Sequence, residues 1–198
     1  MAYRIPANDI VSIIDAPPRP AALLGPGRRF VALVHYESHP PVAHLARPYL
    51  SLAGLRLDPA LGGRQRIRRL TGLSVIALPG GEPRRIDLPE GKSVSMPSWA
   101  PDGRRFAVTV DEPDHIAVWV VDAQAATAAQ VPGLRVRDVL GGDPTSLNST
   151  VRWSRDGRSL LVLGSPAPPE EPGPEPIEPR VEEAAGKRSQ MATFTDLL

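Results

Sequence analysis

The fold class of this sequence is decided by the stretch Ser98-Trp99-Ala100-Pro101-Asp102-Gly103-Arg104-Arg105-Phe106-Ala107-Val108-Thr109-Val110. Its Asp-Gly pair favours a tight turn, because glycine readily adopts positive φ and the aspartate side chain accepts hydrogen bonds from the nearby backbone. The residues after the pair are mostly apolar, with β-branched and aromatic members, which favours a strand. The tryptophan ends the strand before the turn, where its ring can fill space between neighbouring sheets. The stretch therefore predicts a β-hairpin.

The same pattern recurs 54 residues later, in Arg152-Trp153-Ser154-Arg155-Asp156-Gly157-Arg158-Ser159-Leu160-Leu161-Val162-Leu163. Both copies read Trp-x-x-Asp-Gly-Arg-x and continue into a strand. A weaker copy at residues 24–33 keeps Gly-Arg-Arg-Phe and the strand but lacks the tryptophan and the aspartate. A hairpin-rich unit that recurs at about 40–50 residues is typical of β-propeller blades. The residues expected to form the structural turns are Trp99, Asp102, Gly103, Trp153, Asp156 and Gly157.

Short strands separated by turn residues fill most of the remaining chain. β-rich runs span residues 30–36, 50–57, 72–78, 84–88, 116–122 and 127–131. Before them, residues 5–15 read as a short helix, with Asn8 as its N-cap and Ile10, Ile13 and Ile14 on one face. A helix this short needs a surface to pack against. The pattern predicts an all-β protein with a short N-terminal helix.

We divide the chain into three parts. Residues 1–20 are a helix and lead-in, residues 21–165 a partial β-propeller, and residues 166–198 a Pro/Glu-rich linker or loop followed by the start of a further element. The middle part has material for about three blades, whereas propellers usually close with about four to eight. The predicted fold is therefore an incomplete all-β propeller. The chain is a fragment, a truncated gene product or a protomer completed by another chain, and we favour the fragment.

Composition narrows the function classes. Hydrophobic residues make up 41% of the 198 residues, and 23 basic against 22 acidic residues leave a net charge of +1. This balance gives no reason to expect nucleic acid or a membrane as a partner. There is no cysteine, which excludes thiolate chemistry. With no visible signal peptide the expected location is the cytoplasm, whereas an incomplete N-terminus would leave the periplasm or secretion open.

Two sets of polar residues contain the right types for a metal site or a catalytic site. His35, His39 and His44 are spaced along one segment, but they match no recognised ligand spacing, so we expect no metal and no cofactor. Ser149, His115 and either Asp138 or Asp143 have the composition of a catalytic triad. Because triads are defined by geometry, turn and capping roles are the simpler interpretation of these residues.

A basic run gives the candidate substrate-binding residues, Arg64, Arg66, Arg68 and Arg69, with Arg84 and Arg85 close by. One interpretation is an electropositive patch that attracts acidic side chains of a peptide substrate. The other is a solvated face, which is the commoner fate of a charge run.

An ordered set of stretches adds a more specific signal. It comprises residues 3–6 with 10–17, 53–59, 71–74, 97–103, 140–144, and the proline-rich stretch that leads to 194–198. Together these resemble the N-terminal propeller region of the prolyl oligopeptidase family of serine peptidases, in particular its glutamyl-peptidase-like branch. The sequence departs from that family at residues 24–27, where a Ser-Pro-Asp-Gly turn is more usual.

In that family the propeller precedes a C-terminal α/β-hydrolase domain that carries the catalytic serine, aspartate and histidine. The resemblance implies that this chain limits the access of peptide substrates to such a domain, and that its partners are the missing blades and the hydrolase domain. The sequence contains no Gly-x-Ser-x-Gly elbow, so no catalytic residue is assigned to it. An alternative is a stand-alone propeller-like interaction module that is completed by oligomerisation.

Overall fold

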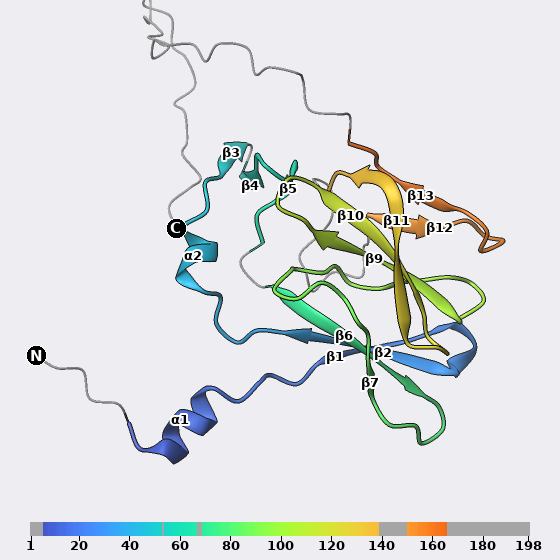
Figure 1. Ribbon diagram of the computed structural model, residues 1–198, viewed down its shortest axis with the longest axis horizontal. Helices are drawn as coiled ribbons and strands as arrows, with labels where there is room; N and C mark the ends of the chain where they lie inside the picture. Colours follow the sequence, from blue (N-terminus) through green and yellow to red (C-terminus); the bar gives the residue numbers. More distant parts are fainter. Residues whose placement is uncertain (1–5, 53, 67–68, 139–149, 166–198) are drawn as a thin grey trace, which may run out of the picture.

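The computed structural model describes residues 6–52, 54–66, 69–138 and 150–165, and most of them lie in antiparallel strands (Figure 1). The described strands form two sheets of four strands, one of three and one of two. This architecture confirms the prediction of an incomplete, all-β propeller.

The first blade is the sheet with the order β1-β2-β6-β7. All neighbouring strands are antiparallel, and β2 pairs with β6 from Phe30 opposite Ala77 to Tyr36 opposite Leu70. Alternate residues of β2 are buried, which is the period of a strand with one face on a core. The strands are β1 (Ala21–Leu24), β2 (Phe30–Tyr36), β6 (Leu70–Ala77) and β7 (Arg84–Arg85).

The second blade is a four-stranded meander, in which each strand pairs with the next along the chain. Its strands are β8 (Ser98–Trp99), β9 (Arg105–Asp111), β10 (Ile116–Asp122) and β11 (Thr127–Val136). Residues 106–110 of β9 are all buried, because side chains on both faces of this sheet meet a neighbouring layer.

The third sheet consists of β12 (Val151–Trp153) and β13 (Leu160–Val162). A bridge between Val136 and Gly164 joins it to the second blade. Leu161 in β13 is 74% exposed, and Leu163, directly after that strand, is 48% exposed. The described part of the chain therefore contains two four-stranded blades and a two-stranded beginning of a third, whose outer side is uncovered.

Two hydrophobic cores hold the blades together. The larger core joins the first two blades, and its side chains include Val34, Val75, Phe106 and Val108. The smaller core joins the second blade to β12 through Ala107, Val118, Val136 and Val151. Because β9 sends alternate side chains into the two cores, the second blade is the shared layer of the molecule.

The connection between β2 and β6 carries an insertion at the opposite end of the molecule from the β1–β2 turn (Figure 1). It contains α2 (Val42–Leu45) and a small sheet of β3 (Leu50–Leu52), β4 (Leu55–Asp58) and β5 (Gly63–Arg64). The expectation of one β run over residues 50–57 was wrong, since Leu52 pairs with Leu55 across a reversal. Gly54 has a φ of +78°, which a glycine adopts without the steric cost of a Cβ.

The N-terminal helix α1 spans Asn8–Ile14. The prediction that Asn8 caps it was wrong, because the N-cap is Ala7, with no side-chain hydrogen bond, and Asn8 is already helical. Ile13 is 76% exposed, and Ile10 and Ile14 are also exposed, so the apolar face of α1 is open. No helix in the described part of the chain has the length and apolar character needed to cross a bilayer.

Candidate functional site

The turn between β8 and β9 is held by its own aspartate. The Asp102 Oδ1 atom accepts hydrogen bonds from the backbone N–H groups of Arg104 at 2.8 Å and Arg105 at 3.3 Å. Although burial opposes it, these donors and the Arg105 guanidinium lower the pKa of Asp102. Gly103 supplies the positive φ of +63° that the turn requires.

The turn between β12 and β13 repeats this geometry. The backbone N–H of Arg158 donates to Asp156 Oδ1 at 3.0 Å, and Gly157 has a φ of +67°. The Ser154 hydroxyl also donates to Asp156, and this bond, together with the Arg158 N–H, lowers the pKa of the Asp156 carboxyl. The structure thus places all six predicted turn residues in or beside two equivalent hairpin turns.

The turn between β1 and β2 and the turn between β8 and β9 touch each other across the boundary of the first two blades. Arg29 donates from Nη2 to the Asp102 carbonyl oxygen at 3.2 Å. A Cβ on Gly103 would lie 1.8 Å from the Pro26 carbonyl oxygen, and a Cβ on Gly25 would lie 3.1 Å from the Trp99 ring. Both glycines therefore permit a close approach of neighbouring turns that a side chain would prevent.

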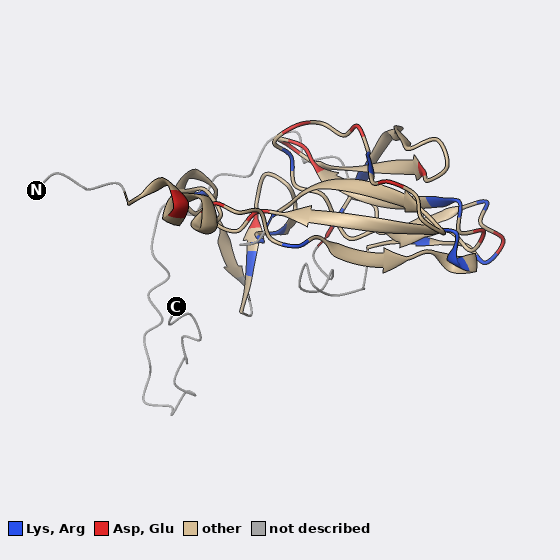
Figure 2. Cartoon of the chain, turned by 90° about the horizontal axis from the view of Figure 1, so that it is seen from below, with Lys and Arg blue, Asp and Glu red and all other residues tan. Residues whose placement is uncertain are grey.

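The turn between β8 and β9 and the turn between β12 and β13 are joined by an equivalent contact. Arg105, which occupies the position of Arg29 in the repeat, donates from Nη2 to the Gly157 carbonyl oxygen at 3.1 Å. Its guanidinium also lies 5.2 Å from the centroid of the Trp153 ring, and Trp153 Nε1 donates to the Ser98 carbonyl at 2.8 Å. Figure 2 shows basic segments gathered at this end of the molecule, far from the N-terminus. The third repeat has Ser159 at the arginine position.

The predicted substrate-binding arginines lie in and after the insertion, at the other end. Arg66 forms an ion pair with Asp138, and Arg69 lies 3.7 Å from Glu37, with both arginine side chains 16% exposed. Arg64 is in β5, where its backbone N–H donates to the Asp138 carbonyl, and Arg68 lies outside the described residues. The charges of Arg66 and Arg69 are thus compensated within the chain, and a substrate-binding role for this run stays a prediction.

Arg66 belongs to a cluster of charges that joins the insertion to the second blade. A second pair, Arg47 with Asp58 at 2.5 Å, anchors the insertion from within. Asp111, at the end of β9, has no ion pair of its own in the described part of the chain. Burial raises the pKa of Asp111, although the positive charges of Arg66 and Arg47 act in the opposite direction. The cluster therefore includes one carboxyl whose ionisation is disfavoured in the folded state.

The three histidines do not converge on one point. His35 Nε2 lies 2.8 Å from Ser74 Oγ, and burial, followed by the positive charge of Arg85, lowers its pKa. His44 Nε2 donates to the Arg66 carbonyl at 2.5 Å, and His39 is exposed in a loop. Within the residues that the structure describes, no group of three or more His, Asp or Glu side chains is placed to hold a metal ion.

The residues of the conceivable triad are not brought together either. His115 Nδ1 lies 2.8 Å from Asp114, and Asp138 is the partner of Arg66. Asp143 and Ser149 lie outside the described residues. The geometry given for His115 and Asp138 supports the turn and ion-pair roles over a catalytic one.

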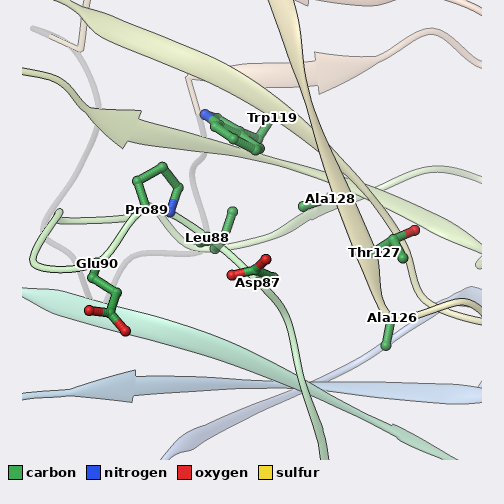
Figure 3. A pocket seen from close by; sticks show the side chains of 8 residues that line it. All are labelled: Asp87, Leu88, Pro89, Glu90, Trp119, Ala126, Thr127 and Ala128. Atoms are coloured by element: carbon green, nitrogen blue, oxygen red, sulfur yellow. The ribbon is translucent and has the colours of Figure 1, made fainter.

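Sequence reasoning missed a groove between the outer edges of the first two blades. Its volume is about 590 Å³. Figure 3 shows the Trp119 ring on one side, with Asp87, Leu88 and Pro89 facing it. The sequence shows acidic and apolar residues side by side after β7, from Asp87 to Glu90. Nothing in the sequence indicates that this linker lies beside β10. The lining residues are Asp87, Leu88, Pro89, Glu90, Trp119, Ala126, Thr127 and Ala128.

Comparison with known proteins identifies two plant relatives along the whole chain. The chain is 32% identical over 213 residues to a protein of Arabidopsis thaliana named probable glutamyl endopeptidase, chloroplastic, covering 99% of this chain and 21% of the relative. It is 30% identical over 213 residues to the protein of the same name from Oryza sativa subsp. japonica, covering 100% of this chain and 22% of the relative. The chain thus spans about a fifth of the length of these curated relatives. No family model matches the sequence.

Two solved structures are also similar. The β-propeller domain of the Trilobed protease from Pyrococcus furiosus matches with a TM-score of 0.39 and 16% identity, over 74% of this chain and 34% of that one. An acylaminoacyl peptidase in complex with Z-Gly-Gly-Phe-chloromethyl ketone matches with a TM-score of 0.41 and 18% identity, over 83% of this chain and 20% of that one.

Proposed function

We propose that this chain is the propeller portion of a serine peptidase, because it is similar over its whole length to two proteins named glutamyl endopeptidase. In this role it gates the access of peptides to a catalytic α/β-hydrolase domain outside this sequence. The observation that carries the proposal is the match at about 30% identity to two proteins named glutamyl endopeptidase, along a chain that folds into successive blades.

The arrangement of the blades supports a gating role. Two complete blades and the start of a third share one row of turns, and the third sheet leaves Leu161 and Leu163 exposed. Further blades would bury these side chains and remove the open edge of β13. A closed ring of blades surrounds a central channel. In the proposed role this channel admits an extended peptide and excludes a folded protein.

The experiment uses the gene product with any continuation after Leu198. It is treated with a fluorophosphonate probe of active serines and assayed on short glutamate-containing peptides, with the 198-residue chain as the control. We expect the longer protein to react and to cleave after glutamate, and the 198-residue chain to do neither. A complete product that neither reacts with the probe nor cleaves peptides would contradict the proposal.

Exposed Leu161 and Leu163 also favour a second candidate, an interaction module that closes by oligomerisation. It predicts a defined oligomer of the 198-residue chain in light scattering, with a cooperative melt. A monomer whose third sheet is covered only in a longer protein would exclude this alternative.

A further inference from the structure

The groove at the outer boundary of the first two blades has the composition of a binding site. On one side it is lined by the linker after β7, which contributes Asp87, Leu88, Pro89 and Glu90, and on the other by β10 and β11 (Figure 3). We propose that this groove binds a lysine or arginine side chain carried by a peptide segment of a partner protein. The proposal does not depend on the proposed peptidase function.

The charge of the groove is negative and uncompensated by its own lining. Asp87 and Glu90 are exposed, and neither forms an ion pair with another residue that the structure describes. Asp58 and Asp138, by contrast, each pair with an arginine of the chain. The two groove carboxylates are therefore free to receive a cation from outside.

Trp119 supplies the second element of cation recognition. Figure 3 shows its ring across the groove from Asp87. A guanidinium or ammonium group between an indole face and a carboxylate gains both a cation–π contact and a charge-assisted hydrogen bond. An anionic or purely apolar occupant would leave the carboxylates without a partner, so charge complementarity selects the cation.

The size of the groove fits a peptide rather than a simple amine. A groove of about 590 Å³ has room for a long side chain and the adjoining backbone.

The wall formed by the β10–β11 turn is held in place before any partner binds. Arg84 donates from Nη2 to the carbonyl oxygens of Ala123 at 3.1 Å and Gln124 at 2.8 Å, which ties the first blade to this turn. Asp122 Oδ1 accepts from the backbone N–H of Gln124 at 2.8 Å. Ala126, in the lining, has a φ of +59°, a conformation that costs a residue with a Cβ about 1–2 kcal/mol. A fixed wall reduces the ordering cost of binding.

The test is a titration of the 198-residue chain with acetyl-Gly-Arg-Gly-amide, followed through the indole N–H signals of its three tryptophans in NMR. The Trp119 signal is assigned with Trp119→Phe. We expect a saturable shift of that signal alone. The matched peptide with citrulline, which keeps the shape of arginine but not its charge, should bind about tenfold more weakly.

A double variant, Asp87→Asn with Glu90→Gln, removes the charge of the groove. It should lose about tenfold in affinity for the arginine peptide. A matched control, Asp15→Asn with Glu82→Gln, changes two exposed carboxyls elsewhere and should bind like the parent chain. Equal affinity for arginine and citrulline, equal affinity of the double variant and the control, or no saturable shift at Trp119 would each overturn the proposal.

Discussion

The two ends of the molecule hold their blades together in different ways. At the turn end, hairpin turns of successive blades meet through the repeated arginine contacts of Arg29 and Arg105 with backbone carbonyls. At the insertion end, ion pairs such as Arg66 with Asp138 join a segment that has no counterpart in the second blade. The turn end depends on close backbone approach, whereas the insertion end depends on compensated charge. Only the arginine contact at the turn end recurs from one blade to the next.

The largest loss of stability is expected when a side chain is added where two turns approach each other at the turn end. In Gly103→Ala the new Cβ would collide with the Pro26 carbonyl oxygen, and the residue has a positive φ. Backbone strain and overpacking together should lower the free energy of unfolding by about 4 kcal/mol. Urea denaturation measures this loss. The control is Gly27→Ala, with a φ of +75° but open space around its Cβ, which should lose only about 1 kcal/mol. Equal losses for the two would remove close approach as the cause.

A somewhat smaller loss is expected at the insertion end. Arg66→Met leaves the Asp138 carboxylate, whose side chain is 6% exposed, without its partner. Removing one member of a buried pair costs about 3 kcal/mol, because the remaining charge is desolvated and unpaired. The same urea experiment provides the value. The double variant Arg66→Met with Asp138→Asn should recover part of this loss. If it recovers none, the unpaired Asp138 carboxylate is not the cause of the lower stability.

A substitution of Asp111, in the same charge cluster, is expected to stabilise the protein rather than destabilise it. Because burial raises its pKa in the folded state, folding favours the protonated carboxyl, and the associated stability is lost as pH rises from the unfolded value of 3.8 through the folded one. Asp111→Asn should therefore melt at a higher temperature than the parent chain at pH 7, and the difference should vanish at acidic pH. Thermal melts across pH measure it. A lower melting temperature of the variant at neutral pH would contradict the assignment.

The smallest effect is expected at His35, in the first blade. Burial and Arg85 lower its pKa in the folded state, so the unfolded chain binds the proton more strongly. Stability is full above the unfolded value of 6.5 and declines as pH falls through it toward the folded pKa. His35→Gln should weaken this decline between pH 7 and pH 5 in thermal melts. An unchanged pH profile would mean that His35 does not contribute.

The contrast between the two ends also explains what the sequence could predict. Asp102-Gly103 and Asp156-Gly157 carry their turn geometry locally, so two copies predicted two hairpins and the propeller. The pairing of Arg66 with Asp138 spans 72 positions and depends on how the insertion folds back, which no local pattern encodes. For the same reason residues 64–69 read as an open basic patch. The reversal at Gly54 was missed because a glycine between leucines also fits one continuous strand.

The groove lay beyond sequence reasoning for a related reason. Asp87 and Trp119 come from different blades, and only the packing of those blades brings them to one groove. Each residue alone has an ordinary interpretation, as a turn residue or a core residue. The relation to glutamyl endopeptidases, in contrast, was accessible because it rests on an ordered set of stretches along the whole chain.

The proposed gating function is tested most directly with the gene product that includes any continuation after Leu198, by comparing its cleavage of short and long substrates. Arg105→Ala with Trp153→Ala breaks the contact between the second and third turns, with Arg158→Ala, at an exposed residue of the same turn, as the control. The rate of cleavage after glutamate is compared for a short peptide and an unfolded protein substrate. If the propeller gates access, the double variant should cleave the long substrate faster, while the short peptide is cleaved at the parent rate. If the double variant is less stable than the parent but cleaves the two substrates in the parent ratio, the proposed gating is contradicted.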